Sequence, residues 1–389
     1  MKLFIIPSWY PTKLHPESGS FFQDWAILLN QTKIQVHLIS SIQHSLWDIN
    51  NYKNINGKSF EFFQNLPTYR NETINIYPKF EKKAFYRFQK HLINYFKEIV
   101  EKIGQPDLVF FHSSLWAGCA LSDYLDKNQI PYMISEHLKE FLLPNGFNSF
   151  QYRHIDQTYK NCSSIIATST ALKNAISSQF SSYNNKLCII PNPVDENIFS
   201  LKSEKGIKNS ITIICVALFR SEKRLDIIIS AIYNLIKSGA NLTLKIIGDG
   251  PLRSVIQKQI KSLKIIDNVQ LLGYLNQSEI VRQLHSSDLF ILASEVETFG
   301  VALVEAQMCG LPVVCTDCGG PRDIVTEETG ILVKSQSIKS LTVGINKTIE
   351  KLNQYSPKRI REKTIAQFGV KAYTDSISKL CQNIINPKA

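Results

Sequence analysis

The sequence predicts an α/β protein built from two doubly wound, Rossmann-like domains that face each other across a cleft. Short apolar strands alternate with longer amphipathic stretches in two consecutive runs, and the segment around Pro191 and Pro193 breaks the pattern between them. Alternation of this kind indicates βαβ units with parallel sheets. At 389 residues the chain is long enough for two domains with separate cores.

The first run predicts buried strands at residues 3–6, 36–40, 108–111, 132–135, 164–168 and 187–190. The second run predicts strands at 211–217, 242–247, 268–272, 288–292, 312–316 and 330–333. A polar stretch at 203–210 is the expected linker, and the tail after about residue 357 has a helical, amphipathic pattern. We therefore assign residues 1–193 to a first domain and residues 194–364 to a second. A C-terminal helix of about 365–389 is expected to cross back to the first domain.

Composition and charge limit the classes of function. No apolar run approaches the roughly 18 residues of a membrane span. The apolar start before Pro7 is too short for a signal peptide, so we expect a cytoplasmic protein. The net charge of +11 favours anionic partners, which include nucleotide phosphates, acidic lipids and nucleic acids. The eight cysteines are scattered, and the pair Cys315 and Cys318 lacks the further ligands of a zinc site.

A cationic loop separates the first strand of the second run from its helix. Arg220, Lys223 and Arg224 lie in this loop, between a strand that ends near Ala217 and a helix that begins near Leu225. Side-chain cations at a helix N-terminus, together with its free N–H groups, suit a diphosphate. A solvated turn is the alternative interpretation of this segment taken alone.

A glycine-rich turn follows the next strand. Gly248 and Gly250 allow close approach of the backbone to a ligand. Arg253 stands where the third glycine of a dinucleotide-binding fingerprint would be, which argues against a nicotinamide enzyme.

The segment 294–314 combines a loop, a helix and a strand, and it carries two carboxylates. Glu297 falls in the loop and Glu305 in the helix, which Gly310 and Pro312 end. The spacing of the two glutamates has no specificity by itself, and Glu305 alone could be an ordinary solvent-facing carboxylate. Loops that open helices at the carboxyl edge of a parallel sheet are where α/β proteins bind charged ligands.

Several motifs of the second half occur in one order at regular spacings: Arg220 with Lys223, Gly248-Asp249-Gly250, Leu272-Gly273-Tyr274, Glu297-Thr298-Phe299-Gly300 through Glu305-Ala306, Gly310-Leu311-Pro312-Val313-Val314, and Gly319-Gly320. Together they resemble the donor-binding domain of the retaining nucleotide-sugar glycosyltransferases with the GT-B fold, glycosyltransferase family 4 (group 1). The resemblance continues more weakly over residues 1–200, where the loop after Pro7 is similar to the first acceptor-domain loop of that family.

The resemblance implies catalytic roles for four residues. Lys223, helped by Arg220, would bind the donor diphosphate and stabilise charge on the leaving nucleotide. Glu297 would hold hydroxyls of the donor sugar. His137 matches a histidine that lies near the reacting centre in relatives, although a histidine taken alone is more often structural and Glu136 could be the polar partner instead.

The remaining implied contacts are with the donor. Glu305 would bind the ribose hydroxyls, and Gly19 would let the first loop approach the phosphate or the acceptor. Further donor contacts are implied for Gly248, Gly250, Gly273, Tyr274, Phe299, Gly300 and Val301.

Two features of the sequence bear on the phosphate ligands and on the need for a metal. Relatives often carry Gly-Arg or Gly-Asn where this chain has Ala217-Leu218, and Arg224 replaces a common glycine. Arg220 is therefore a less secure phosphate ligand than Lys223. No Asp-x-Asp pair exists in the chain, so we expect metal-independent chemistry with no cofactor.

Residues 79–102 combine lysines with aromatic residues. Phe85, Phe88, Leu92, Phe96 and Ile99 follow helical spacing and are flanked by cations. Such a helix suits an anionic membrane surface, while a core helix with a solvated basic face is the equally weighted alternative.

The sequence thus predicts a retaining hexosyltransferase that moves a sugar from a nucleotide-diphosphate donor to a glycan or lipid-linked acceptor in surface polysaccharide or lipopolysaccharide biosynthesis. Nucleic acid is not an expected partner. Two alternatives remain open: a nucleotide-sugar 2-epimerase of the same fold, and an inactive binding subunit of a glycan assembly complex.

Overall fold

The computed structural model describes residues 1–16, 18–47, 55, 57–201 and 210–387, and the chain divides into two compact units. The first unit contains residues 1–168, 172–190 and 374–389, and the second contains 169–171 and 191–373. The sequence analysis placed the corresponding boundaries at 193/194 and about 365. The predicted linker at 203–210 lies outside the described residues except for Ser210.

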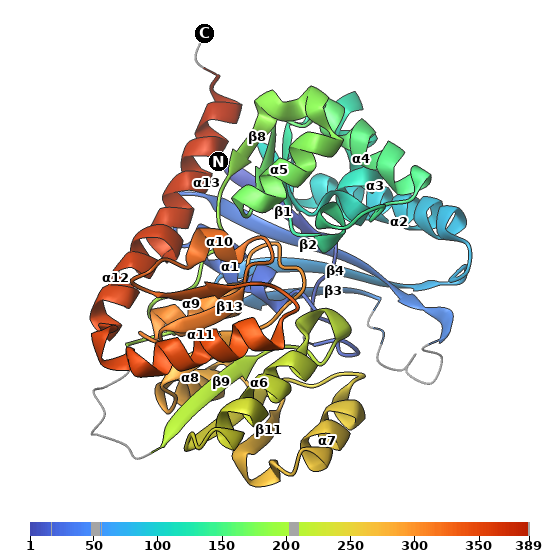
Figure 1. The fold of residues 1–389 in the computed structure, drawn as a ribbon. Helices are drawn as coiled ribbons and strands as arrows, with labels where there is room; N and C mark the ends of the chain where they lie inside the picture. The colour runs from blue at the N-terminus through green and yellow to red at the C-terminus, as the bar shows by residue number, and fades with distance from the viewer. Residues whose placement is uncertain (17, 48–54, 56, 202–209, 388–389) are drawn as a thin grey trace. The chain divides into compact units, whose positions relative to one another are not determined.

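The first unit is built on one largely parallel sheet. Its described strands follow the order β3-β4-β2-β1-β5-β6-β7-β8, in which only β3 is antiparallel to its neighbour. The strands are β1 (Lys2–Pro7), β2 (Gln35–Ser45), β3 (Lys58–Phe63), β4 (Leu66–Asn75), β5 (Leu108–His112), β6 (Tyr132–Glu136), β7 (Ser164–Ala167) and β8 (Leu187–Ile189). The helices are α1 (Ser20–Asn30), α2 (Glu81–Ile103), α3 (Cys119–Lys127), α4 (Ser149–Asn161) and α5 (Thr170–Gln179), and α2 to α5 gather on one face of the sheet (Figure 1).

The hairpin of β3 and β4 is absent from the sequence prediction. Its strands are rich in polar residues and form no continuous apolar run, which is why no buried strand was expected there. Gln64 and Asn65 make the turn with positive φ angles of 46° and 61°. A two-residue turn in which both residues have a left-handed backbone has the same twist as the antiparallel strands that it joins. This turn therefore favours a tight hairpin.

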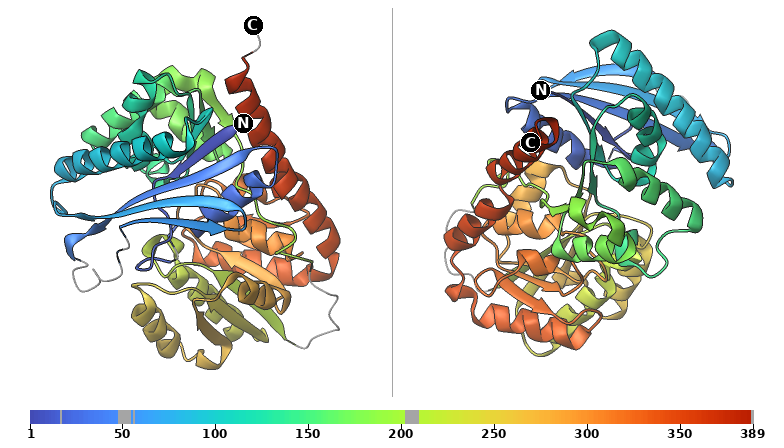
Figure 2. Two further views of the ribbon diagram at one scale, coloured as in Figure 1. Left: turned by 180° about the vertical axis from the view of Figure 1, so that it is seen from behind. Right: turned by 90° about the horizontal axis from the view of Figure 1, so that it is seen from above.

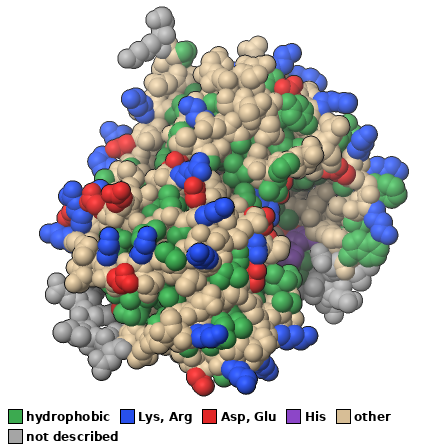
Figure 3. Space-filling view, viewed as in Figure 1, with side chains coloured by type: hydrophobic (Ala, Val, Ile, Leu, Met, Phe, Trp, Pro, Cys, Tyr) green, Lys and Arg blue, Asp and Glu red, His purple; other side chains and the backbone are tan. Residues whose placement is uncertain are grey.

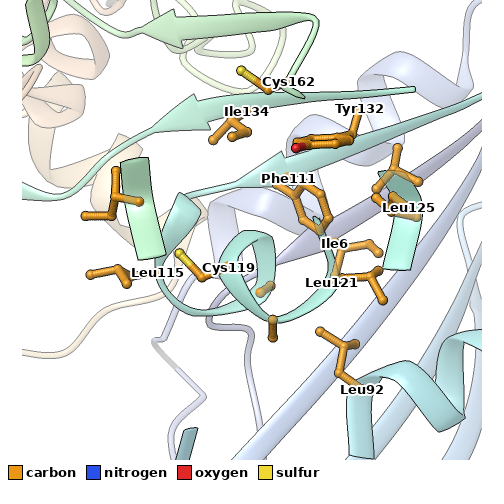
Figure 4. Packing of buried hydrophobic residues seen from close by; sticks show 14 of the residues in the cluster. Ile6, Leu92, Phe111, Leu115, Cys119, Leu121, Leu125, Tyr132, Ile134 and Cys162 are labelled. Carbon is orange, nitrogen blue, oxygen red and sulfur yellow. The ribbon is translucent and has the colours of Figure 1, made fainter. Parts of the chain in front are cut away.

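Helix α2 is a core helix. The five apolar residues named for it by the sequence analysis are all buried in the hydrophobic core of the first unit. Figure 4 shows Leu92 among the packed side chains of Ile6 and Leu121. The hypothesis that this apolar face rests on a membrane is therefore wrong, because the face already covers the sheet.

The second unit has a six-stranded parallel sheet, counted over the described residues, in the order β11-β10-β9-β12-β13-β14. The strands are β9 (Ile211–Val216), β10 (Leu242–Ile247), β11 (Val269–Gly273), β12 (Leu289–Leu292), β13 (Val313–Thr316) and β14 (Gly330–Val333). The helices are α6 (Leu225–Lys237), α7 (Arg253–Ser262), α8 (Gln277–His285), α9 (Val301–Met308), α10 (Pro321–Ile324), α11 (Ile338–Glu350), α12 (Pro357–Phe368) and α13 (Val370–Ile385), of which α13 passes into the first unit at residue 374. Figure 2 gives two further views of these elements.

Each sheet has one point at which the strand order reverses. In the second unit the chain builds outward from β9 through β10 and β11, and then restarts beside β9 with β12. In the first unit β1 and β5 are the corresponding neighbours. Ligands of doubly wound sheets bind at the carboxyl ends of such strand pairs, so the loops after β9 and β12 are the first place to look for a site.

The chain has 44 lysine and arginine residues against 33 aspartate and glutamate residues, and Figure 3 shows Lys and Arg side chains spread over the viewed face. Over the described part of the chain, no helix has both the length and the apolar character that a membrane crossing requires.

Candidate donor site

Lys223 and Glu297 meet at the point where the strand order of the second sheet reverses. Lys223 lies in the loop after β9, and Glu297 lies in the loop after β12. Lys223 Nζ donates to Glu297 Oε1 over 2.5 Å, and Ser294 Oγ donates to the same oxygen over 2.7 Å. Glu297 Oε2 accepts no hydrogen bond from the described residues, so this oxygen remains available to a ligand.

The ion pair is partly shielded from water. The side chains of Lys223 and Glu297 are 23% and 13% exposed. Burial disfavours the charged form of Lys223, yet the adjacent Glu297 carboxylate and its hydrogen bond outweigh this effect and raise the pKa of Lys223. The ammonium group is therefore positively charged throughout the neutral range.

The other two cations of the loop differ in their availability. Arg220 is exposed and forms no ion pair with the described residues. Arg224 is bound to Asp226 through two hydrogen bonds of 3.0 and 2.9 Å. Its backbone is left-handed, with φ 48° and ψ 44°, a conformation that favours glycine. Arg220 is thus better placed than Arg224 to meet an anion.

The glycines after β10 and β11 pack against the loop that carries Lys223. Gly248 has φ 124°, and a Cβ atom there would lie 2.1 Å from the carbonyl oxygen of Ala217. A Cβ atom at Gly250 would lie 2.9 Å from the carbonyl oxygen of Phe219. Gly248 N–H also donates to Gly273 O over 2.8 Å. These glycines let three strand ends approach closely, which fixes the course of the cationic loop.

The loop after β12 is held against the loop after β13. Glu297 N–H donates to Cys318 O over 3.1 Å, and Gly320 N–H donates to Glu297 O over 2.9 Å. Gly300, with φ 112°, precedes the first turn of α9. The backbone around Glu297 is therefore fixed on both sides.

The other predicted donor contacts lie in the loop after β12, on α9 and directly after β11, and their side chains differ in exposure. Phe299 is 1% exposed and packs against Phe368, so its side chain is structural. Val301 and Glu305 are half-buried on α9, and Tyr274, which directly follows β11, is 59% exposed.

Gly19 and His137 belong to the first unit, where aromatic rings connect them. A Cβ atom at Gly19 would lie 2.7 Å from the ring of Trp9 and 3.1 Å from that of Phe22. The ring of Phe22 lies edge-on to His137, with ring centroids 5.2 Å apart, and stacks on His112 at 4.5 Å. This glycine therefore permits the first loop to pack beside the two histidines.

The two histidines are neutral. His112 Nδ1 and His137 Nε2 are 3.1 Å apart, so one of these nitrogens donates to the other. Burial lowers the pKa of His137 to about 3, and burial together with the neighbouring imidazole lowers the pKa of His112 well below its usual range.

Glu136 is fully buried and does not pair with His137 in any hydrogen bond of the described residues. Its carboxyl group accepts hydrogen bonds from Tyr159 Oη at 2.7 Å, Ser113 Oγ at 3.2 Å and Ser114 N–H at 3.2 Å. Burial raises the pKa of this carboxyl group. Glu136 is accordingly a structural anchor at the end of β6.

Sequence reasoning missed Ser294 and His112 as site residues. Both stand at the carboxyl end of a strand, β12 and β5 respectively, and β12 and β5 each lie at the reversal point of their sheet. That position was the available signal, because side chains after such strands converge on one edge.

Comparison with known proteins identifies the two halves of the chain. The model described as "Glycosyl transferases group 1" matches residues 197–367, and the model described as "Glycosyltransferase Family 4" matches residues 28–198. The N-acetyl-alpha-D-glucosaminyl L-malate synthase of Bacillus anthracis is 31% identical over 196 residues, which cover 48% of this chain and 50% of that protein. Curated relatives of this kind are matched over only 34% to 50% of their own length.

Solved structures share the whole fold at low sequence identity. The sucrose-phosphate synthase from Thermosynechococcus elongatus superposes with a TM-score of 0.78 at 15% identity, over 100% of both chains. HepE of Anabaena, solved in complex with UDP, gives a TM-score of 0.75 at 18% identity, over 97% of this chain and 99% of that one. The chain belongs to the group 1 glycosyltransferases, glycosyltransferase family 4, and has their GT-B fold of two parallel-sheet α/β domains.

Proposed function

We propose that the protein is a retaining glycosyltransferase that moves a sugar from a nucleotide-diphosphate donor to a glycan or lipid-linked acceptor, in surface polysaccharide or lipopolysaccharide assembly. The observation that carries this proposal is the Lys223–Glu297 pair, 2.5 Å apart where the loops after β9 and β12 meet. The UDP bound by HepE and the synthase named for Bacillus anthracis support a nucleotide-sugar donor and a sugar transfer.

The chemistry of the pair fits donor activation. Transfer breaks the bond between the sugar and the diphosphate, so negative charge grows on the leaving phosphate in the transition state. A fixed cation aimed at that charge lowers the barrier. Lys223, with Arg220 beside it in sequence, would bind the diphosphate, and Glu297 Oε2 would accept a hydrogen bond from a sugar hydroxyl. Glu305 would hold the ribose hydroxyls.

We propose a front-face reaction in which the leaving phosphate accepts the proton of the acceptor hydroxyl. Lys223 and Ser294 both donate to Oε1 of Glu297. The carboxylate would therefore hold the substrate through its other oxygen, Oε2. The neutral His137 would act as a hydrogen-bonding group near the sugar. No metal or cofactor is proposed, because the sequence has no Asp-x-Asp pair and the protein supplies cations of its own.

A mass-spectrometric assay tests this function. The protein is incubated with UDP-, GDP- and ADP-sugars, each with and without methyl glycosides and polyprenyl-linked glycosides as acceptors. One donor should yield a product heavier by one sugar and the free nucleoside diphosphate, and NMR of the product should show the anomeric configuration of the donor. Isomerisation of the donor without acceptor would instead identify an epimerase. Absence of any turnover in a folded preparation would favour a binding subunit.

We further propose a peripheral membrane contact through a surface other than the apolar face of α2. Phe60, Phe62 and Phe63 on the edge strand β3 are 54%, 65% and 50% exposed. Lys102 lies over the ring of Phe60, with Nζ 6.0 Å from its centroid. Exposed aromatic rings beside lysines suit an anionic bilayer surface.

Liposome flotation tests this contact. The wild-type protein should float with vesicles that contain phosphatidylserine and should not float with phosphatidylcholine alone. The variant Phe62→Ser should float less, whereas Val255→Ser, which removes an exposed apolar side chain in the second unit, should float like the wild type. Equal behaviour in both vesicle types would contradict the contact.

A further inference from the structure

A pocket of about 490 Å³ lies in the first unit, where the carboxyl ends of β1, β2 and β4 meet the first turns of α2. This volume falls in the range of roughly 300–1,000 Å³ that small-molecule sites occupy. The wall consists of hydroxyl, amide and aromatic side chains for the most part, and it includes Ser8, Trp9 and Tyr10 of the loop that the sequence analysis compared with an acceptor-domain loop.

Ser41 and Gln43 of the wall each carry a buried polar atom that has no hydrogen-bond partner in the described part of the chain. Ser41 is 3% exposed, and both Ser41 Oγ and Gln43 Nε2 are buried without a hydrogen-bond partner among the described residues. An unpaired buried polar group costs about 1–3 kcal/mol. A ligand that offers hydroxyl groups would satisfy both atoms.

Aromatic rings form the apolar part of the wall. Trp9 and Trp116 are half-buried, and Tyr10, Phe85 and Phe88 are buried. Rings of this kind supply large contact area at low cost in side-chain freedom. A flat, partly apolar ring with hydroxyl groups on its rim matches such a wall.

The charge of the wall is the most selective feature. In a chain with a net charge of +11, the residues that line this pocket include no lysine or arginine. Its carboxylate, Glu81, already accepts hydrogen bonds from the amides of Asn148 and Gln151, each over 2.8 Å. The donor loop presents Lys223 and Arg220, whereas His15 is the one basic side chain among the described residues that line this pocket.

We infer that this pocket binds an uncharged sugar ring of the acceptor, with Ser41 and Gln43 as specificity-determining residues. The inference rests on the proposed transferase function. It limits the acceptor of that reaction to one whose sugar carries neither a phosphate nor a carboxylate group. Phosphorylated or carboxylated sugars are disfavoured there, because no lysine or arginine among the described residues lines the pocket to balance their charge.

Saturation-transfer NMR on the full chain tests this inference. The probes are uncharged methyl glycosides of glucose, galactose, mannose and N-acetylglucosamine, each compared with the corresponding sugar 6-phosphate, with and without saturating UDP. At least one uncharged glycoside should bind, and more tightly than its 6-phosphate. Gln43→Ala and Ser41→Ala should each weaken that binding by about three- to tenfold, as expected for the loss of one hydrogen bond.

Two control variants distinguish an effect of the pocket residues on binding from a general effect of substitution on the first unit. Gln382→Ala and Ser178→Ala change exposed residues of the same unit and should leave glycoside binding unchanged. Tighter binding of 6-phosphates, no binding of any uncharged glycoside, or unchanged binding in both pocket variants would overturn the inference. Nucleoside diphosphate binding is measured in parallel on the same variants. If the wild type binds no nucleoside diphosphate, the result counts against the proposed function. If the wild type binds a nucleoside diphosphate but no glycoside, the result counts against the pocket alone.

Discussion

Lys223 Nζ and Glu297 Oε1 lie 2.5 Å apart although 74 positions separate the two residues in the sequence. Each residue follows one of the two neighbouring strands at which the sheet order of the second unit reverses, β9 for Lys223 and β12 for Glu297. The topology therefore creates the contact, and the partly buried position shields the pair from solvent and salt more than a surface ion pair is shielded. The first two predictions concern this pair.

The ion pair should make stability depend on alkaline pH. The pKa of Lys223 is raised above its ordinary value of 10.5 in the native state, although burial acts in the opposite direction. The resulting stabilisation is fully present below pH 10.5 and is lost as the pH rises through the higher native value. Urea unfolding at pH 8 to 11.5 should show a steeper alkaline loss for wild type than for Lys223→Met. Parallel curves would contradict the assignment.

Glu297→Gln should separate donor binding from transfer. The amide oxygen can still accept from Lys223 and Ser294, so the loop should keep its conformation, while the charged acceptor for the sugar hydroxyls is lost. We expect kcat/KM to fall on the order of 100-fold, with nucleoside diphosphate affinity within a few fold of wild type. Glu295→Gln is the control, because Glu295 is exposed and bonds to Gln336. Comparable turnover in the two variants would remove Glu297 from the site.

His137 should stay neutral far below its ordinary pKa of 6.5. Burial lowers the pKa of His137 to about 3, so the unfolded chain binds a proton that the native chain does not. The free energy of unfolding should therefore fall by up to about 1.4 kcal/mol per pH unit below pH 6.5 because of this residue. His137→Gln should reduce that acid dependence. An NMR titration that protonates His137 near pH 6.5 would contradict the prediction.

Gly248 and Gly273 form a matched pair for testing backbone constraint. Alanine at Gly248 would place Cβ 2.1 Å from Ala217 O, whereas alanine at Gly273 meets no atom within 4 Å and suffers only from its positive φ of 71°. We expect a loss of stability of about 3 kcal/mol for Gly248→Ala and about 1 kcal/mol for Gly273→Ala. Chemical denaturation measures both, and equal losses would show that close packing is not the constraint.

The sequence predicted the parallel strands because buried β1, β5, β9 and β12 are uninterrupted apolar runs between helices. It could not predict the β3–β4 hairpin, whose pairing depends on two left-handed turn residues and on polar side chains that become buried in the fold. The family and the α/β class are confirmed.

The candidate site was predicted only in part. The resemblance pointed to Lys223 and Glu297, but their mutual ion pair and the Ser294 contact depend on strand order, which spacing does not encode. The apolar periodicity of α2 correctly indicated an amphipathic helix. Periodicity cannot tell whether such a face covers a sheet or a membrane, and the structure shows that it covers the sheet.

The most direct test of the account is calorimetric titration of UDP, GDP and ADP into the wild type, Lys223→Met and Lys237→Met. Lys237 is an exposed lysine at the end of α6 and serves as the matched control. We predict that one nucleotide binds the wild type and the control equally, and that Lys223→Met weakens this binding by about ten- to a hundredfold, as for a hydrogen bond to a charged group. Equal affinity in all three proteins, or no binding of any nucleoside diphosphate to the wild type, would contradict the assignment of the donor site.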